Sequence, residues 1–217
     1  FAAVDGQGFA RLADAGIAVT VGPGAAQAER TMAGFLMRQC RGRPHVTLKL
    51  ALSLDGCIAT ARGESRWITG AEARAHGHLE RARADAILVG HGTYAADSPR
   101  LDVRLAGLEQ RSPPRLLLSR GAEPPAGWSV LRDPSEIATI AGDTLLVEGG
   151  MATAAAFIAA DLVDRLLLYR APILIGDGRG LPELGLGALA DAQGRWALHD
   201  RRTLGSATLD VYERTRS

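Results

Sequence analysis

The sequence predicts a three-layer α/β domain: a mixed, mainly parallel central sheet with helices on both faces and a C-terminal antiparallel hairpin. Three observations predict this fold. Apolar strand patterns alternate with helical patterns over most of the 217 residues. Some strands are continuously apolar, such as AILVG at 86–90, which is typical of strands covered on both faces. The last segment, 195–214, contains two strand patterns in succession.

The composition favours chemistry on a small molecule. The 25 basic and 24 acidic residues give no overall field that would attract nucleic acid or an anionic membrane. The two cysteines, Cys40 and Cys57, are expected to be free and offer no zinc-site spacing, so no metal is expected. The sequence has no apolar run of membrane-spanning length and no signal peptide. We therefore expect a cytoplasmic protein.

The first 43 residues are expected to precede the main domain. They contain a short strand or helix and then a helical segment, which Gly42 ends with Pro44 just beyond it. Because the chain starts at Phe1 and not at Met, we expect a fragment or a processed product with a domain missing upstream. Residues 44–217 then form the main domain.

The first strand of the main domain, 45–54, has two unlike faces. Its even positions are all apolar, and its odd positions carry smaller or polar residues and one cation: Val46, Leu48, Leu50, Leu52 and Leu54 against Thr47, Lys49, Ala51 and Ser53. A lysine between two leucines on a central strand must reach solvent or meet a partner. A ligand or a carboxylate is the expected partner, and Asp97 is one candidate.

The remaining elements follow in order. Turns at Asp55-Gly56 and Arg62-Gly63 lead to a helix at 71–84, for which Thr69 is the expected N-cap and Glu72 completes a capping box. After the strand at 86–90, a turn carries Asp97. Further strands are expected at 115–119, 144–150 and 165–176, with a helix at 151–164 and a surface loop before the hairpin.

Several polar groups are candidates for chemistry, and each has a plainer alternative. The turn VEGG leads from a strand into a helix, where free N–H groups suit an anion, and Glu148 either meets a ligand or caps that helix. Asp97 fits either a site or ordinary turn chemistry. The donors Ser65, Arg81, Arg100 and Arg104 suit a phosphate or are solvated, and Ser119-Arg120 could read a ribose 2′-phosphate or form a turn.

Two further groups of residues are poor candidates. His76 and His78 lie two apart on a helix, so they point to different sides and do not form a metal pair. Cys57 has no histidine and carboxylate placed near it in a recognisable nucleophile pattern. We therefore expect neither a metal site nor a cysteine nucleophile.

Four stretches taken together resemble the reductase domain of the bifunctional riboflavin-biosynthesis deaminase/reductase family: RPHVTLKLALSLDGCIA, GESRWIT, AILVGHGTYAADSPRLDVR and LLVEGG. The resemblance covers residues 44–217. It implies a dihydrofolate-reductase-like fold, a dimer or larger homo-oligomer, and NADPH as the cofactor. It also implies reduction of the opened ribose of 5-amino-6-(5-phosphoribosylamino)uracil to a ribityl chain.

The same resemblance makes residues 1–43 the last part of a deaminase domain. The family's zinc-binding His-Ala-Glu and Pro-Cys-x-x-Cys segments are absent from this sequence. We therefore do not expect this fragment to deaminate, although a longer parent chain would be able to.

The resemblance also implies a role for individual residues, taken position by position. NADPH would contact Ala51, Trp67, Thr93, Asp97, Ser119 and the turn formed by Gly150, Met151, Ala152, Thr153, Ala154, Ala155 and Ala156. The substrate would contact Ser65, Arg81, Leu101, Arg104 and Glu148, with Ser65 and the arginines nearest its phosphate. Family members often carry Asp near the position of Ser119, so the Ser119-Arg120 pair leaves the 2′-phosphate contacts open.

The hypothesis is hydride transfer to C1′ of the opened ribose. Lys49 would stabilise or protonate the developing charge, Asp97 would hold Lys49 or the sugar hydroxyls, and Glu148 would bind the pyrimidine or relay a proton. Three alternatives stay open: another pterin or pyrimidine reductase on this fold, a non-catalytic dinucleotide-binding module, and a purely structural domain. The last explains the strand lysine poorly.

Overall fold

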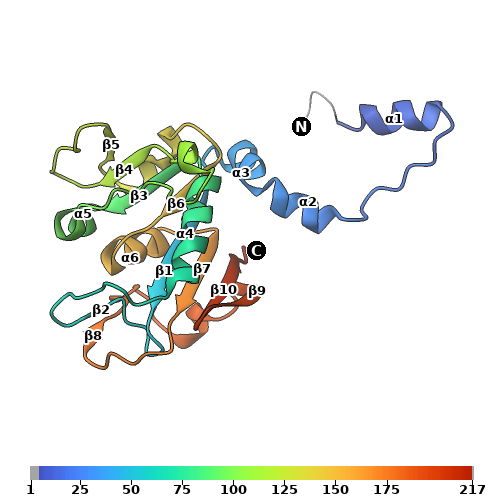
Figure 1. Ribbon diagram of the computed structural model, residues 1–217. Helices are drawn as coiled ribbons and strands as arrows, with labels where there is room; N and C mark the ends of the chain where they lie inside the picture. Colours follow the sequence, from blue (N-terminus) through green and yellow to red (C-terminus); the bar gives the residue numbers. More distant parts are fainter. Residues whose placement is uncertain (1–4, 217) are drawn as a thin grey trace.

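The chain is built around an eight-stranded sheet in the order β5-β4-β3-β6-β1-β7-β10-β9 (Figure 1). The computed structural model describes residues 5–216. The strands of this sheet are β1 (His45–Leu52), β3 (Ala86–Gly90), β4 (Arg115–Leu118), β5 (Trp128–Leu131), β6 (Thr144–Val147), β7 (Arg165–Arg170), β9 (Trp196–Leu204) and β10 (Ala207–Arg214). A separate two-stranded sheet joins β2 (Ala59–Thr60) and β8 (Gly178–Arg179).

The helices include α1 (Gln7–Asp14), α2 (Ala25–Thr31), α3 (Ala33–Arg41), α4 (Ala71–Arg83), α5 (His91–Asp97) and α6 (Met151–Ala159). Three short 3₁₀ helices are η1 (Glu109–Arg111), η2 (Pro134–Thr139) and η3 (Leu189–Ala192). In the sheet, β1, β3, β4, β5, β6 and β7 pair in parallel, whereas β10 pairs antiparallel with both β7 and β9. The predicted fold class, with its antiparallel hairpin at the C-terminal end, is therefore confirmed.

The apolar face of β1 forms the larger core. Val46, Leu48, Leu50 and Leu52 are all buried and cluster with Met151, Ala154 and Phe157 of α6. Burial of a leucine side chain contributes about 1.5–3 kcal/mol, so this alternation holds the strand in register. The expected fifth member, Leu54, is 59% exposed because β1 ends at Leu52 and the chain turns at Asp55-Gly56.

The opposite face of the sheet lies under α4 and α5. Ala73 of α4 packs with Leu167, Tyr169 and Leu209, while Tyr94 of α5 packs with Ile87 and Leu117 in a third cluster. This is also the face that carries the odd residues of β1. Helices on both faces make the three layers that the sequence predicts.

Some predicted boundaries are wrong. Helix α4 is capped by the backbone of Gly70, not by Thr69, and no side chain of the described residues caps it, so the Thr69–Glu72 capping box is absent. The Thr69 carbonyl instead accepts a hydrogen bond from Arg74 at 2.7 Å. Asp97 ends helix α5 and does not lie in a plain turn. The strand expected at 165–176 stops at Arg170, and β5 was not predicted.

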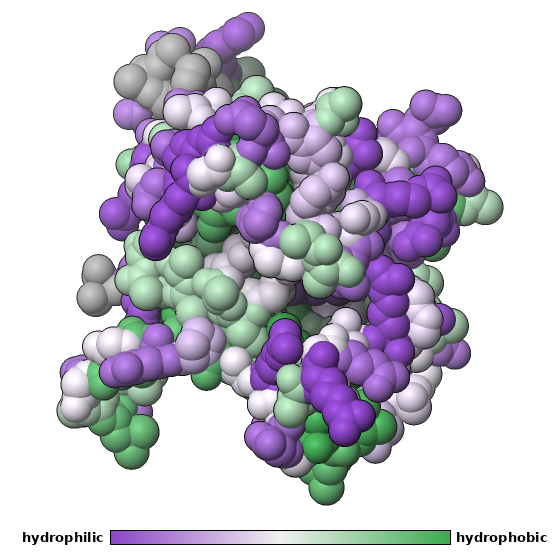
Figure 2. Space-filling model, turned by 90° about the vertical axis from the view of Figure 1, so that its left-hand side faces the viewer, coloured by the Kyte–Doolittle hydropathy of each residue, from purple (hydrophilic) through white to green (hydrophobic). Residues whose placement is uncertain are grey.

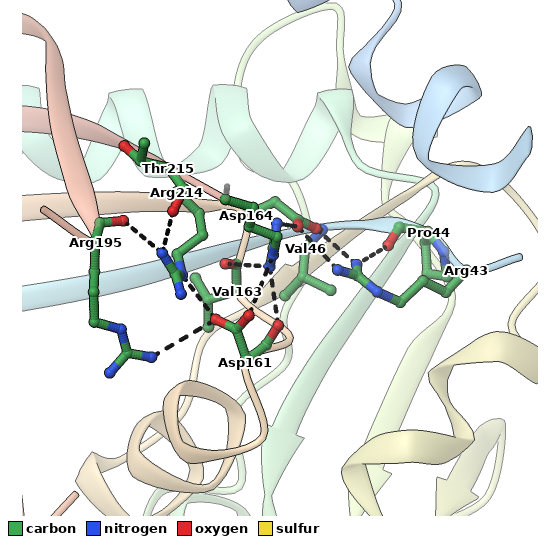
Figure 3. Close-up of polar contacts among 10 residues, drawn as sticks. Arg43, Pro44, Val46, Asp161, Val163, Asp164, Arg195, Arg214 and Thr215 are labelled. Atoms are coloured by element: carbon green, nitrogen blue, oxygen red, sulfur yellow. Dashed lines mark hydrogen bonds and ion pairs between the residues drawn. The ribbon is translucent and has the colours of Figure 1, made fainter. Parts of the chain in front are cut away.

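Ion pairs tie the start of β1 to the C-terminal end of the domain (Figure 3). The buried Asp164 carboxylate accepts hydrogen bonds from Arg43 at 2.7 and 3.0 Å, from the Val46 amide at 2.8 Å and from Arg216 at 2.5 Å. Asp161 accepts from Arg214 at 2.7 Å. These contacts fix β1 to the loop before β7, whereas α1 and α2 extend away from the sheet (Figure 1).

Candidate active site

A cavity of about 550 Å³ opens at the carboxyl ends of β1, β3 and β6, below α4 and α5. Ligands collect at this end of parallel strands, and ligand pockets typically measure about 300–1,000 Å³. The molecular surface on this side is hollowed near its centre (Figure 2). The predicted site residues that line the cavity are Lys49, Ala51, Ser65, Trp67, Arg81, Thr93, Asp97, Leu101, Arg104, Glu148 and Gly150.

Lys49 lies beside a carboxylate at the floor of the cavity. It is the only lysine in the sequence. Because β1 and β6 are parallel neighbours with Leu48 opposite Val147, Lys49 and Glu148 project from the same face. Their charged atoms lie 3.6 Å apart, and the two side chains are only 20% and 10% exposed. The expectation that the strand lysine meets a carboxylate is confirmed.

Glu148 is also held by Arg81 from helix α4. The Arg81 guanidinium donates to Glu148 Oε1 at 2.7 Å and to Oε2 at 2.9 Å, a bidentate arrangement. Burial by itself would raise the pKa of Glu148, but Lys49 and Arg81 lower it to about 2. Glu148 is therefore ionised at neutral pH and acts as a hydrogen-bond acceptor. No side chain of the described residues caps α6, which removes the helix-cap alternative for Glu148.

Asp97 has a different partner from the one expected. Its carboxylate lies 3.3 Å from Arg66, which also donates to the Asp97 carbonyl oxygen at 3.3 Å. Within residues 5–216, Asp97 and Lys49 form no ion pair, because Lys49 turns toward Glu148. The role of Asp97 in holding Lys49 is therefore not supported, whereas its place at the cavity rim is.

The arginines divide into a buried one and exposed ones. Arg81, which was expected near the substrate phosphate, is 14% exposed. Its guanidinium pairs with the Glu148 carboxylate and donates a hydrogen bond to the Asp102 carbonyl oxygen. Arg100 and Arg104 are 78% and 55% exposed and flank Asp102 at 2.8 and 3.6 Å. The exposed pair keeps donors free for an anion, so it suits a phosphate better than Arg81 does.

The turn after β6 is held by threonines. Thr93 Oγ1 accepts a hydrogen bond from the Gly150 amide at 2.8 Å. A Cβ added to Gly149 would lie 2.6 Å from Thr153 Cβ, so the chain approaches too closely for any other residue there. Four members of the predicted cofactor turn are buried and are not among the residues that line the cavity, so their contact with the cofactor stays a prediction: Met151, Thr153, Ala154 and Ala155. Ala152 and Ala156 do not line the cavity either.

Ser119 lies outside the cavity. It is 9% exposed, and its hydroxyl accepts a hydrogen bond from the Ala122 amide at 3.0 Å. The turn interpretation of Ser119-Arg120 therefore fits the structure better than a 2′-phosphate contact.

The cavity residues that sequence reasoning did not assign to the site include Gly77, His78 and Tyr169. His78 Nδ1 lies 3.1 Å from the Asp102 carbonyl oxygen and 3.3 Å from the Arg104 amide. His76 points the other way, toward Tyr169, as the spacing predicted. A glycine inside a helix and a tyrosine on a buried strand are both signals that could have identified Gly77 and Tyr169.

Residues 5–216 contain no group of three or more His, Cys, Asp or Glu side chains placed to hold a metal ion. None of their helices is long and apolar enough to cross a bilayer. Cys40 and Cys57 are both free thiols.

The fold and the position of the site define an α/β domain of the dihydrofolate reductase class. A dihydrofolate reductase structure from Enterococcus faecalis superposes with a TM-score of 0.60 over 79% of this chain and 97% of its own, at 15% identity. At that identity the comparison shows the fold alone, and it confirms the predicted dihydrofolate-reductase-like architecture.

The chain belongs to the RibD C-terminal domain family, whose family model matches residues 44–142 and 135–206. It is similar to the riboflavin biosynthesis protein RibD of Mycobacterium tuberculosis, with 37% identity over 93% of this chain. It spans 64% of that relative's length. A Thermotoga maritima diaminohydroxyphosphoribosylaminopyrimidine deaminase/5-amino-6-(5-phosphoribosylamino)uracil reductase superposes with a TM-score of 0.80 at 25% identity, over 96% of this chain and 67% of that one. The family resemblance read from the sequence is confirmed.

Proposed function

We propose that residues 44–217 form an NADPH-dependent reductase in riboflavin biosynthesis. It would reduce the ribose of 5-amino-6-(5-phosphoribosylamino)uracil to the ribitylamino product. The proposal is supported by family membership and by the printed name of the Thermotoga maritima protein. The observation that carries it is the pairing of the single lysine with an ionised Glu148 on the floor of a cavity large enough for small-molecule ligands.

The residues present fit a nicotinamide dinucleotide. Helix α6 starts at the cavity with the Gly149-Gly150 turn, no side-chain cap among the described residues and no acidic residue in its first turn. Such a helix end suits the diphosphate of a dinucleotide. A Cβ on Gly150 would lie 3.3 Å from Thr93 Oγ1, so glycine keeps this turn open. NADPH, when bound, would supply the hydride that reaches C1′.

The protein's own groups would position the sugar and manage the proton. Lys49 carries the positive charge that stabilises the atom next to C1′ as negative charge develops, and it can donate the proton. Glu148 fixes the ammonium and, because it is ionised, accepts a hydrogen bond from a pyrimidine N–H. Arg81 keeps Glu148 ionised and in place.

The substrate phosphate is assigned to the exposed arginines at the rim. Arg100 and Arg104 lie on the segment after α5, and both line the cavity with Ser65. We assign Arg100 and Arg104 to the phosphate, with Ser65 as a neutral donor.

The test is NADPH oxidation followed by absorbance with the phosphorylated aminouracil. We expect Lys49→Ala to lower turnover by about 100-fold or more, because general acid help is typically worth about 10²- to 10⁴-fold. Near-normal turnover at saturating substrate would refute the assignment of Lys49. Asp97→Asn is expected to act mainly on KM, because Asp97 lies at the rim with Arg66.

The same assay separates the alternatives. Faster oxidation with a pterin or with another pyrimidine would indicate a related reductase on this fold. Binding of NADPH without oxidation in the presence of the aminouracil would indicate a non-catalytic dinucleotide-binding module.

We further propose an origin for residues 1–43, a cellular compartment and an oligomeric state. Residues 1–43 would be the last part of a deaminase domain, and residues 44–217 would act in the cytoplasm as a dimer. Sedimentation analysis of the purified chain tests the dimer, and a monomer at assay concentrations would contradict it.

A further inference from the structure

The ammonium group of Lys49 has a second neighbour besides Glu148. It lies 5.5 Å from the ring centroid of Tyr169, over the ring face. Tyr169 is on β7, opposite Ala51 of β1, so its side chain is on the same face of the sheet as Lys49. A cation over an aromatic face within about 6 Å is attracted by the ring, most strongly where water is excluded. Tyr169 is only 1% exposed.

The ring of Tyr169 is anchored at its far end. Its hydroxyl lies 2.7 Å from His76 Nδ1 on helix α4. Burial raises the pKa of the Tyr169 phenol well above its usual range, and Glu80 and Glu148 raise it further, so the hydroxyl stays protonated. Burial lowers the pKa of His76, which favours a neutral ring, and the tautomer of that ring sets which of the two groups donates. The anchor fixes the position of the far end of the ring.

The third side of Lys49 is closed by helix α4. A Cβ built on Gly77 would lie 3.3 Å from Lys49 Cε. His76 is the residue before Gly77, so one turn of α4 both anchors the ring and borders the lysine stem. Lys49 is therefore enclosed by the Tyr169 ring, the Gly77 backbone and the Glu148 carboxylate.

We propose that Tyr169 and His76 are positioning residues that hold the Lys49 ammonium at the cavity floor. Neither is assigned to contact the reacting atoms. Tyr169 supplies the ring face, and His76 holds the far end of the ring in place beside Lys49. The proposal deepens the proposed function and rests on it, because it concerns the lysine to which the reduction is assigned.

The kinetic test combines substitutions at Tyr169 with Lys49→Met. Tyr169→Leu removes the ring and is expected to lower kcat by about 5-fold, the equivalent of one cation–π contact, without raising the KM for NADPH or substrate. Tyr169→Phe keeps the ring, loses the anchor and is expected to have a smaller effect in the same direction. In the Lys49→Met background, neither change should lower the residual rate further. A purely structural role for Tyr169 would lower both backgrounds equally and overturn the proposal.

A readout that needs no turnover uses the single lysine. With lysine labelled at the ε carbon, the free protein gives one ε-methylene signal by NMR, because Lys49 is the only lysine. We expect this signal to shift in Tyr169→Leu and, by less, in Tyr169→Phe and in His76→Phe. Tyr212→Phe, a tyrosine on β10 outside the cavity, is the matched control and should leave the signal and kcat unchanged.

The outcomes separate the two proposals. If Lys49→Met keeps full turnover, the catalytic assignment of Lys49 fails, and the lysine signal still decides whether Tyr169 positions it. If Lys49→Met is slow but the lysine signal is the same in all Tyr169 and His76 variants, the positioning role is overturned. Tyr169→Phe keeps the volume of the buried ring, so it carries the test if Tyr169→Leu does not fold.

Discussion

Replacing Gly77 by alanine should separate stability from activity. Alanine is favoured over glycine inside a helix by about 1 kcal/mol, which corresponds to a rise in Tm of about 2–4 °C for a domain of this size. The added Cβ would lie 3.3 Å from Lys49 Cε, and apart from its chain neighbours and the adjacent backbone of α4 it would meet no other heavy atom of residues 5–216 within 4 Å. Outside its own helix, the substitution therefore acts on Lys49.

The magnitude follows from that single contact. At 3.3 Å, the Lys49 side chain must move by a few tenths of an ångström. A misplacement of about 1 Å can cost about 10²-fold in rate, so we expect kcat to fall by about 3- to 10-fold. NADPH oxidation at saturating substrate measures the rate, and differential scanning calorimetry measures Tm.

The control is Gly8→Ala in α1, where, apart from the chain neighbours and the adjacent helix backbone, no atom of the described residues lies within 4 Å of the added Cβ. It should leave kcat unchanged. Full activity in Gly77→Ala with a raised Tm would refute the reasoning that Lys49 needs its present position. A fall in Tm together with activity would show that helix α4 moves instead of Lys49.

Three further substitutions test the site and the ion pairs. Glu148→Gln should remove about 3 kcal/mol of stability at neutral pH, because the carboxyl pKa is about 2 in the folded chain against the ordinary glutamate value of 4.5. The wild type should lose that contribution as pH falls from about 5 toward 2, and denaturant titrations of Glu148→Gln should be flatter there. Asp164→Asn should cost about 3–5 kcal/mol in the same titrations, because it leaves Arg43 and Arg216 without their buried partner. Gly149→Ala should abolish NADPH binding measured by calorimetry, because the Cβ would lie 2.6 Å from Thr153 Cβ.

Each of these has an outcome that contradicts it. If the stability of Glu148→Gln falls as steeply between about pH 5 and 2 as that of the wild type, the acid-sensitive contribution does not come from Glu148. Stability for Asp164→Asn equal to that of Asp210→Asn, a buried aspartate paired with Arg201 on the hairpin, would remove any special role of the β1 anchor. Tight NADPH binding by Gly149→Ala would show that the α6 turn does not meet the cofactor.

The sequence was informative where a rule depends on neighbours along the chain. Alternation in β1 identified the buried face and marked Lys49 as exceptional, and the strand-to-helix turn placed Glu148 at a carboxyl end. Together these predicted a lysine and a carboxylate that the structure brings to 3.6 Å.

The sequence was uninformative where the partner of a side chain depends on how distant elements pack together. The residues around Arg81 in the sequence do not show that it pairs with Glu148, 67 positions later, instead of with a phosphate. Local propensity also favoured Thr69 as the N-cap of α4, but in the folded chain the N-cap is one residue later, at Gly70. Tyr169 fitted its strand as an apolar residue, and only the fold reveals His76 at its hydroxyl.

The position of β1 in the sheet has a consequence for synthesis on the ribosome. β1 pairs with β6 and β7, which begin about a hundred residues further along the chain. Its leucines therefore emerge long before α6 and both neighbouring strands exist to cover them. Such segments are prone to aggregate while unpaired, and pairing over this sequence separation is slow. We expect truncated chains that end before β7 to depend on chaperones, and we expect the lysine pocket to be among the last parts of the domain to form.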